Sequence, residues 1–127
     1  HPLASKRSMS LQELAKHPII AGAGELARFD PAFLQEAKAA GAVIRQASSS
    51  ILNIAGAIRS GLGVGGIPCM LGELDPELQL CFLFDEADYD LTLITREEMR
   101  NLPHVRAFND FIASRTAALR YMIEGRV

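Results

Sequence analysis

The chain has 127 residues, 49% of them hydrophobic, and a formal net charge of −2 with basic and acidic residues interspersed. This composition predicts a folded core in one compact domain or two small lobes. It excludes the basic surface with which a chain grips nucleic acid, and its apolar runs are far shorter than the roughly 20 residues that cross a bilayer.

Capping residues predict the first two helices. The sequence Ser10–Glu13 forms a capping box, which predicts a short helix that runs to about Lys16. Asp30 as the N-cap, Pro31 at the first helical position and Gly41 at the end together predict a second helix.

Two strands are predicted on either side of this second helix, the first of them buried, and each is followed by small residues. Ile19–Ala21 opens into the loop Gly22–Gly24, and Ala42–Ala47 leads into Ser48–Ser50. The serines are expected to begin a third helix that ends at Gly61. One apolar face of that helix is predicted to pack inward through Ile51, Ile54, Ala55 and Ile58.

The second half of the chain predicts three more strands and a long helix. The strands are expected over Val64–Pro68, Leu78–Phe84 and Leu91–Thr95, and the helix is expected to begin at Pro103. Its core-facing side is predicted to consist of Val105, Phe108, Phe111, Ile112, Ala118, Leu119 and Met122. Strands that alternate with helices predict an α/β fold, with a mainly parallel sheet flanked by helices.

The stretch AIRSGLGVGGIP, residues 57–68, does not fit a phosphate-binding loop. A nucleotide fingerprint places its glycines between a strand and a following helix, whereas here they follow a helix and enter a strand. Helix termination and close backbone packing explain the glycines more simply.

The sequence predicts no catalytic residues, no metal site and no cofactor. The three histidines, His1, His17 and His104, share no ligand spacing with one another or with the cysteines, and no nucleophile elbow is present. Cys69 and Cys81 lie in apolar contexts, which favours buried free thiols and a cytoplasmic protein over a disulfide.

Two positions could receive a ligand. The helix start at Ser48, Ser49 and Ser50 offers free amides and three hydroxyls, which would suit a small organic anion, although ordinary capping needs only one serine. The loop at Gly22 and Ala23 follows a strand, where open α/β sheets place ligands, although a plain loop would also explain it.

The order of these pieces resembles the effector-binding region of LysR-type transcriptional regulators. The resemblance rests on HPLA at residues 1–4, SLQELAKHPII at 10–20, GLGVGGIP at 61–68 and LTLITREEMRNLPHVRAFNDFIASR from residue 91 onward. Each motif is weak by itself, but their order and spacing cover nearly the whole chain.

The resemblance implies part of a domain with two α/β lobes, similar to type II periplasmic binding proteins, with an effector pocket in the cleft. Residues 1–83 would form the second lobe, and residues 84–127 would return to the first lobe as a crossover strand and the C-terminal helix. Ala4 and Phe84 would lie at the hinge. The cleft would be lined by Gly22, Ala23, Ser48, Ser49, Ser50, Ile67 and Pro68.

The family's winged helix-turn-helix, its linker helix and the first half of the first lobe have no counterpart in these residues, so DNA contact is expected outside this chain. The unpaired strand and helix face then predict a homo-oligomer. Two rivals stay open on the same fold: a periplasmic solute-binding protein of a transporter, and an enzyme that transforms a small molecule.

Overall fold

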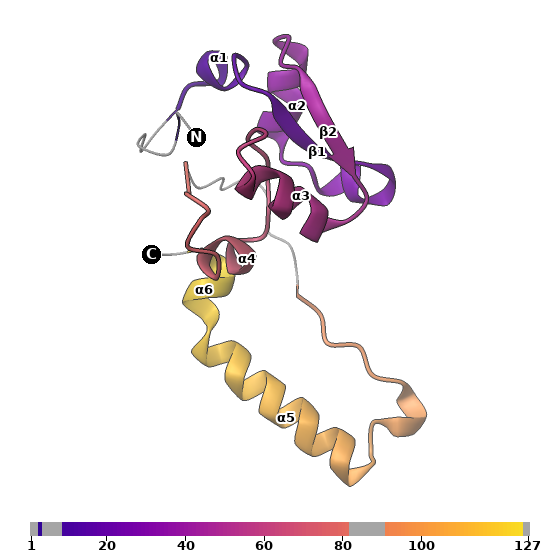
Figure 1. The fold of residues 1–127 in the computed structure, drawn as a ribbon. Helices are drawn as coiled ribbons and strands as arrows, with labels where there is room; N and C mark the ends of the chain where they lie inside the picture. Colours follow the sequence, from indigo (N-terminus) through magenta and orange to yellow (C-terminus); the bar gives the residue numbers. More distant parts are fainter. Residues whose placement is uncertain (1–2, 4–8, 82–90, 126–127) are drawn as a thin grey trace. The chain divides into compact units, whose positions relative to one another are not determined.

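The computed structural model describes residue 3, residues 9–81 and residues 91–125 of the chain (Figure 1). The chain divides into two compact units, His1–Ala87 and Asp88–Val127. The first unit contains a small parallel sheet with helices on both faces, and the described part of the second unit is mainly helical.

Two parallel strands form the sheet of the first unit. Strand β1 (Ile19–Gly22) is followed by a 3-10 helix, by helix α2 (Ala32–Ala39) and then by β2 (Ile44–Ser48). Gly22 pairs with Ser48 at the last position of both strands. The carboxyl ends of the two strands therefore lie side by side.

Successive residues of β1 point to opposite faces of the sheet and reach two separate apolar clusters. Helices α1 (Leu11–Leu14) and α2 cover one face, and α3 (Ile51–Arg59) covers the other (Figure 1). The buried residues of the first cluster are Leu14, Ile19, Ala21, Leu34 and Ala37. Those of the second are Ile20, Ile54 and Ala57.

The ends of these helices agree with the sequence in two places and differ in one. Ser10 is the N-cap of α1, where its hydroxyl accepts a hydrogen bond from the Glu13 amide at 3.2 Å. Gly61, after the end of α3, has a φ of +74°, a left-handed conformation that glycine adopts at little cost. The prediction that Asp30 caps α2 is wrong, because Pro31 is the N-cap and the Asp30 carboxylate bonds elsewhere.

The glycine-rich stretch lies along the edge of β1 opposite β2. The Ile20 amide donates to the carbonyl of Val64 at 2.8 Å, and the Val64 amide donates to the carbonyl of Pro18 at 2.9 Å. Gly65 lies so close to this edge that a Cβ there would come within 2.5 Å of the Ile20 carbonyl oxygen and 3.1 Å of Ile58. The prediction of close packing at these glycines is confirmed.

The predicted strand Val64–Pro68 is wrong, because the pairing with β1 is a single bridge at Val64. Gly65 and Gly66 favour strands poorly and Pro68 has no amide hydrogen to donate, so the ladder stops after one residue.

In the described residues, two further predicted strands do not form either. Residues 78–81 and 91–95 are irregular, while residues 82–84 lie outside the described residues. A strand persists only where a neighbouring strand accepts its hydrogen bonds. The predicted strand over Leu91–Thr95 is therefore wrong. The predicted strand over Leu78–Phe84 is wrong for residues 78–81, the part that the structure describes.

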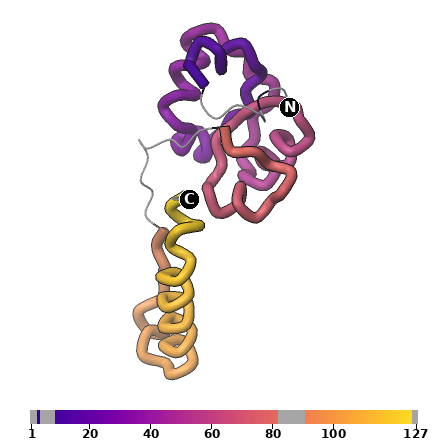
Figure 2. Tube along the Cα trace, turned by 90° about the vertical axis from the view of Figure 1, so that its left-hand side faces the viewer, coloured from indigo at the N-terminus to yellow at the C-terminus, as the bar shows by residue number. Residues whose placement is uncertain are grey.

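The described part of the second unit begins with the irregular residues 91–96 and continues with the 3-10 helix η2 (Glu97–Met99), α5 (Pro103–Ala118) and α6 (Arg120–Glu124). Pro103 occupies the first turn of α5, as predicted. The helix breaks at Leu119, and α6 continues in roughly the same direction (Figures 1 and 2).

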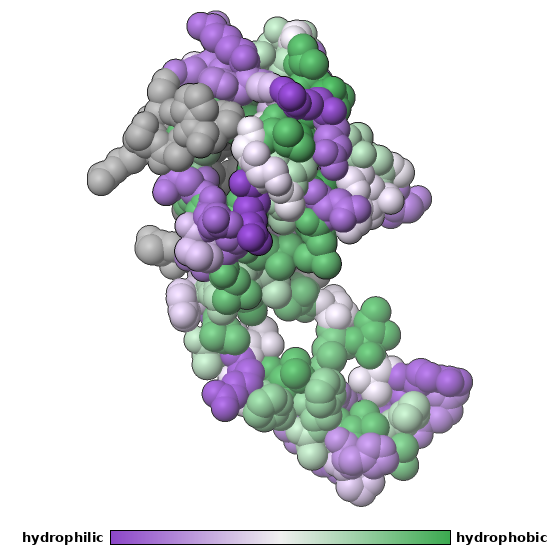
Figure 3. Space-filling model, viewed as in Figure 1, coloured by the Kyte–Doolittle hydropathy of each residue, from purple (hydrophilic) through white to green (hydrophobic). Residues whose placement is uncertain are grey.

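The prediction that α5 faces a core is wrong within the described residues, since none of its side chains is buried. Large apolar side chains of this unit instead face solvent, many of them more than half exposed (Figure 3). They are Leu91, Leu93, Ile94, Met99, Leu102, Phe108, Phe111, Leu119 and Tyr121.

Candidate functional site

The carboxyl ends of β1 and β2 bring together the small residues that the sequence singled out. The Ala23 amide, just beyond β1, donates a hydrogen bond of 2.9 Å to the carbonyl of Ser48 at the end of β2. Gly22, the residue before Ala23, is the sheet partner of Ser48. Two loops that are 25 residues apart in the sequence therefore leave the sheet at one place, at the edge where open α/β sheets place ligands.

The loop after β1 turns back over the end of its own strand. The 3-10 helix η1 (Gly24–Phe29) packs so closely that a Cβ on Gly22 would lie 2.7 Å from the carbonyl oxygen of Leu26. The Gly22 amide donates to Oδ1 of Asp30 at 2.8 Å. This hydrogen bond joins the residue before the loop, Gly22, to the residue after η1, Asp30.

The serines do not cap α3 with their side chains. Ser50 is the N-cap residue, but its side chain makes no capping hydrogen bond. The Ser48 hydroxyl instead accepts from the amide of Ser50 at 3.1 Å, and the Ser49 side chain is exposed. The alternative in which one serine performs ordinary capping is therefore wrong.

The first turn of α3 offers amide donors beside these serines. The first hydrogen bond into this helix runs from the Ile54 amide to the Ser50 carbonyl at 3.1 Å. The amides of Ile51, Leu52 and Asn53 consequently have no acceptor inside the helix, and the helix dipole makes this end partly positive. An anion of small size suits such an arrangement.

Ile67 and Pro68 occupy different environments. Ile67 packs against the same buried cluster as Leu26 and Ile51. Leu26 follows the loop at Ala23, and Ile51 follows the serines. It therefore shares an apolar cluster with both loops. Pro68 is exposed and is the N-cap of helix α4 (Cys69–Glu73). The two predicted hinge residues, Ala4 and Phe84, lie outside the described residues.

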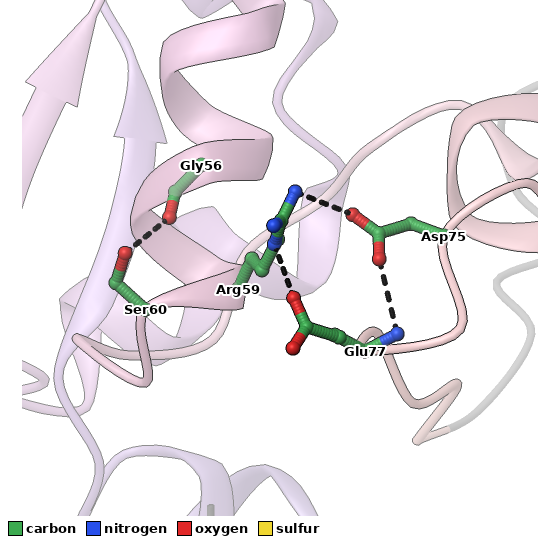
Figure 4. A network of polar contacts seen from close by, with 5 residues as sticks. All are labelled: Gly56, Arg59, Ser60, Asp75 and Glu77. Atoms are coloured by element: carbon green, nitrogen blue, oxygen red, sulfur yellow. Dashed lines mark hydrogen bonds and ion pairs between the residues drawn. The ribbon is translucent and has the colours of Figure 1, made fainter.

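A polar network lies at the C-terminal end of α3 (Figure 4). Arg59 donates from Nε to Glu77 at 2.5 Å and lies 3.7 Å from a carboxylate oxygen of Asp75. These side chains border a shallow open hollow, together with Leu71, Leu74 and Pro76. No local sequence pattern indicates this network, because the two acidic partners lie 16 and 18 residues after Arg59.

Asp30 has a different role from the N-cap that its sequence position predicts. Its position before Pro31 is typical of an N-cap, whereas the structure uses its carboxylate to hold Gly22 and to pair with Lys38 at 3.2 Å. The spacing of eight residues in each direction carries no helical or strand periodicity that would have indicated either contact.

Both cysteines are free thiols and half-buried. Burial raises the pKa of the Cys81 thiol, because a thiolate loses its hydration where the protein covers it. At neutral pH the Cys81 thiol should therefore react more slowly than a solvent-exposed thiol.

The family model described as the LysR substrate binding domain matches residues 1–117. The chain therefore belongs to the LysR substrate binding domain family. The comparisons with curated proteins and with solved structures give no match.

Among the described residues, no helix combines the length and the apolar character that a membrane crossing requires.

Proposed function

We propose that this chain is the effector-sensing part of a LysR-type transcriptional regulator and that it binds a small organic anion at the carboxyl ends of β1 and β2. The hydrogen bond between Ala23 and Ser48 is the observation that carries the proposal, because it holds two candidate loops at one ligand-facing edge. Membership in the family supports the same reading.

Each part of the proposed site has a distinct role. The amides at the start of α3 and the Ser49 hydroxyl donate to the anion, since that helix end is partly positive and Ser49 is exposed. Ala23, half-buried beyond the end of β1, lets the ligand approach the backbone. Gly22 is covered by η1 and gives that loop the room to pack against the end of β1, and Ile67 contributes an apolar wall. Pro68, exposed at the N-cap of α4, would line the rim.

The proposed fold is that of a partial type II periplasmic-binding-protein domain. Residues 1–83 form one lobe, and residues 84–127 cross to the other lobe through a hinge at Ala4 and Phe84. A ligand in the cleft between lobes shifts their equilibrium only by the difference between its affinities for the two arrangements.

This proposal assigns the chain no catalysis and no cofactor. It implies a cytoplasmic homo-oligomer whose contact with DNA is made by a winged helix-turn-helix outside these residues. Family membership favours sensing over solute transport or enzymatic turnover.

A thermal-shift screen tests the site directly. The chain is melted in the presence of a panel of small mono- and dicarboxylic acids, and a binder raises Tm because it stabilises only the folded state. The triple variant Ser48→Ala/Ser49→Ala/Ser50→Ala should lose at least half of the Tm shift that the best acid produces.

The matched control is Ser60→Ala, which changes the same residue type at the other end of α3, where the hydroxyl donates to the Gly56 carbonyl at 2.8 Å. It should keep the full Tm shift. An equal response of the triple variant and the parent chain would remove the serines from the site, and a panel without any binder would contradict the organic-anion proposal.

A further inference from the structure

Asp30 is a nearly buried carboxylate that neither a helix cap nor the proposed ligand contacts use. Its side chain is 7% exposed, whereas its partner Lys38 in α2 is 23% exposed. Oδ1 accepts from the Gly22 amide at 2.8 Å, and Oδ2 accepts from Nζ of Lys38 at 3.2 Å. One carboxylate thus joins the end of β1 to α2.

We infer that Asp30 is a positioning residue for the ligand-binding loop, and that it acts by holding the Gly22 amide so that η1 stays closed against the end of β1. This inference rests on the proposed function in so far as it concerns ligand affinity. The contact between Asp30 and Gly22 itself stands on the structure alone.

The loop between these two residues contacts Ser48 and shares an apolar cluster with Ile67. Its first residue after β1, Ala23, is bonded to Ser48 on the neighbouring strand. Leu26, in the middle of η1, packs against the same buried cluster as Ile51 and Ile67. A change in the position of this loop therefore alters the surroundings of Ser48 and of the cluster on which Ile67 packs.

The packing at Gly22 explains why one hydrogen bond can control the loop. With no side chain at Gly22, η1 approaches to a distance at which a Cβ would meet the Leu26 carbonyl at 2.7 Å. The Gly22 amide is then held by Asp30. A buried amide that loses its acceptor favours an open loop in which water reaches it.

Lys38 has a supporting role in this arrangement. Its ammonium lies on the second oxygen of the carboxylate, which stabilises the charge of a nearly buried group and leaves Oδ1 free for the Gly22 amide. The hydrogen bond to Gly22 needs an acceptor at residue 30, whereas the ion pair needs only opposite charges at residues 30 and 38. This difference separates a positioning role from a purely structural ion pair.

Amide hydrogen exchange, followed by NMR on the full chain, tests the inference without any ligand. Asp30→Ala should accelerate exchange at Gly22 by about tenfold or more, while the Ile20 amide, bonded to Val64, should keep its rate. Asp30→Asn keeps an acceptor oxygen and should retain the slow exchange at Gly22.

The charge-reversed pair Asp30→Lys/Lys38→Asp preserves the two opposite charges but removes the acceptor. It should exchange at Gly22 as fast as Asp30→Ala does. The matched control is Asp75→Ala, since Asp75 also accepts a backbone amide, that of Glu77 at 3.0 Å, and also pairs with a cation, Arg59. This control should leave the exchange rate at Gly22 unchanged.

Three results would overturn the positioning role: slow exchange at Gly22 in the charge-reversed pair, fast exchange in Asp30→Asn, or an equal acceleration at Gly22 and Ile20 in Asp30→Ala. In a second arm, the carboxylic acid with the largest Tm shift should bind Asp30→Ala at least fivefold more weakly than Asp30→Asn. A panel that yields no binder would contradict the proposed function, while the exchange rates would still decide the role of Asp30.

Discussion

The amide of Ala23 and the carbonyl of Ser48 are joined by a 2.9 Å hydrogen bond just beyond the paired ends of β1 and β2. This bond links two stretches of small residues that are 25 positions apart in the sequence. The loop at Ala23 is further held by Asp30 through Gly22, and the loop at Ser48 leads into the free amides of α3. The arrangement at the ends of the two strands is therefore held mainly by backbone hydrogen bonds.

The glycines beside β1 give a prediction about stability. Gly65→Ala should lower the free energy of unfolding by about 1–3 kcal/mol, because its Cβ would press on the Ile20 carbonyl oxygen and on Ile58. Gly56→Ala is the matched control, since nothing lies within 4 Å of a Cβ there. This control should raise stability by roughly 0.5–1 kcal/mol, as alanine does inside a helix. Urea unfolding measures both, and equal effects of the two substitutions would contradict the packing described.

The network at Arg59 should contribute little to stability. Arg59→Gln removes the ion pairs with Asp75 and Glu77, but the Arg59 side chain is 56% exposed, so solvent screens both pairs. We expect a loss of no more than about 1 kcal/mol, which should shrink further as salt is added. Urea unfolding at low and high ionic strength checks this, and a salt-independent loss of about 2 kcal/mol or more would show that the network is structurally essential.

The raised pKa of Cys81 predicts slow alkylation. Burial disfavours the thiolate, so the alkylation rate of Cys81 should rise with pH only above the range in which an unfolded thiol reacts. The variant Cys69→Ser isolates Cys81, and iodoacetamide labelling is followed by mass spectrometry with and without concentrated urea. A folded-state pH profile that coincides with the profile in urea would contradict the effect of burial.

The exposed apolar side chains of the second unit predict self-association. Phe108 and Phe111 in α5 are 56% and 54% exposed, and soluble monomers rarely leave such residues grouped with further exposed leucines and isoleucines. Light scattering on a size-exclusion column should give a mass above that of one chain. Phe108→Glu should reduce the associated fraction, whereas Ala113→Glu, the same charge at another exposed position of α5, should not. A clean monomer of the parent chain would refute the homo-oligomer.

The sequence predicted the elements whose signals are local. Ser10 at the start of α1, Pro103 at the start of α5 and Gly61 after α3 act through their own backbone neighbours, so their roles can be recognised without knowledge of the fold. The apolar strand at Ile19 was equally clear, because all four of its residues are buried.

The elements that the sequence mispredicted depend on distant partners. Val64 pairs with β1 for one residue only, and residues 91–95 have no neighbouring strand in the described part of the chain, although their side chains favour strands. Asp30 likewise has the identity of an N-cap but is used by an amide eight residues earlier. Local propensity cannot anticipate contacts that only the folded backbone creates.

NMR titration of the full chain with the panel of small carboxylic acids would locate the anion site residue by residue. We expect at least one acid to shift the amide resonances of Ala23 and of residues 49–52 most strongly, with much smaller changes at Arg59 and Glu77. Changes confined to the hollow at Arg59, or no changes with any acid of the panel, would contradict an anion-binding site at the ends of β1 and β2.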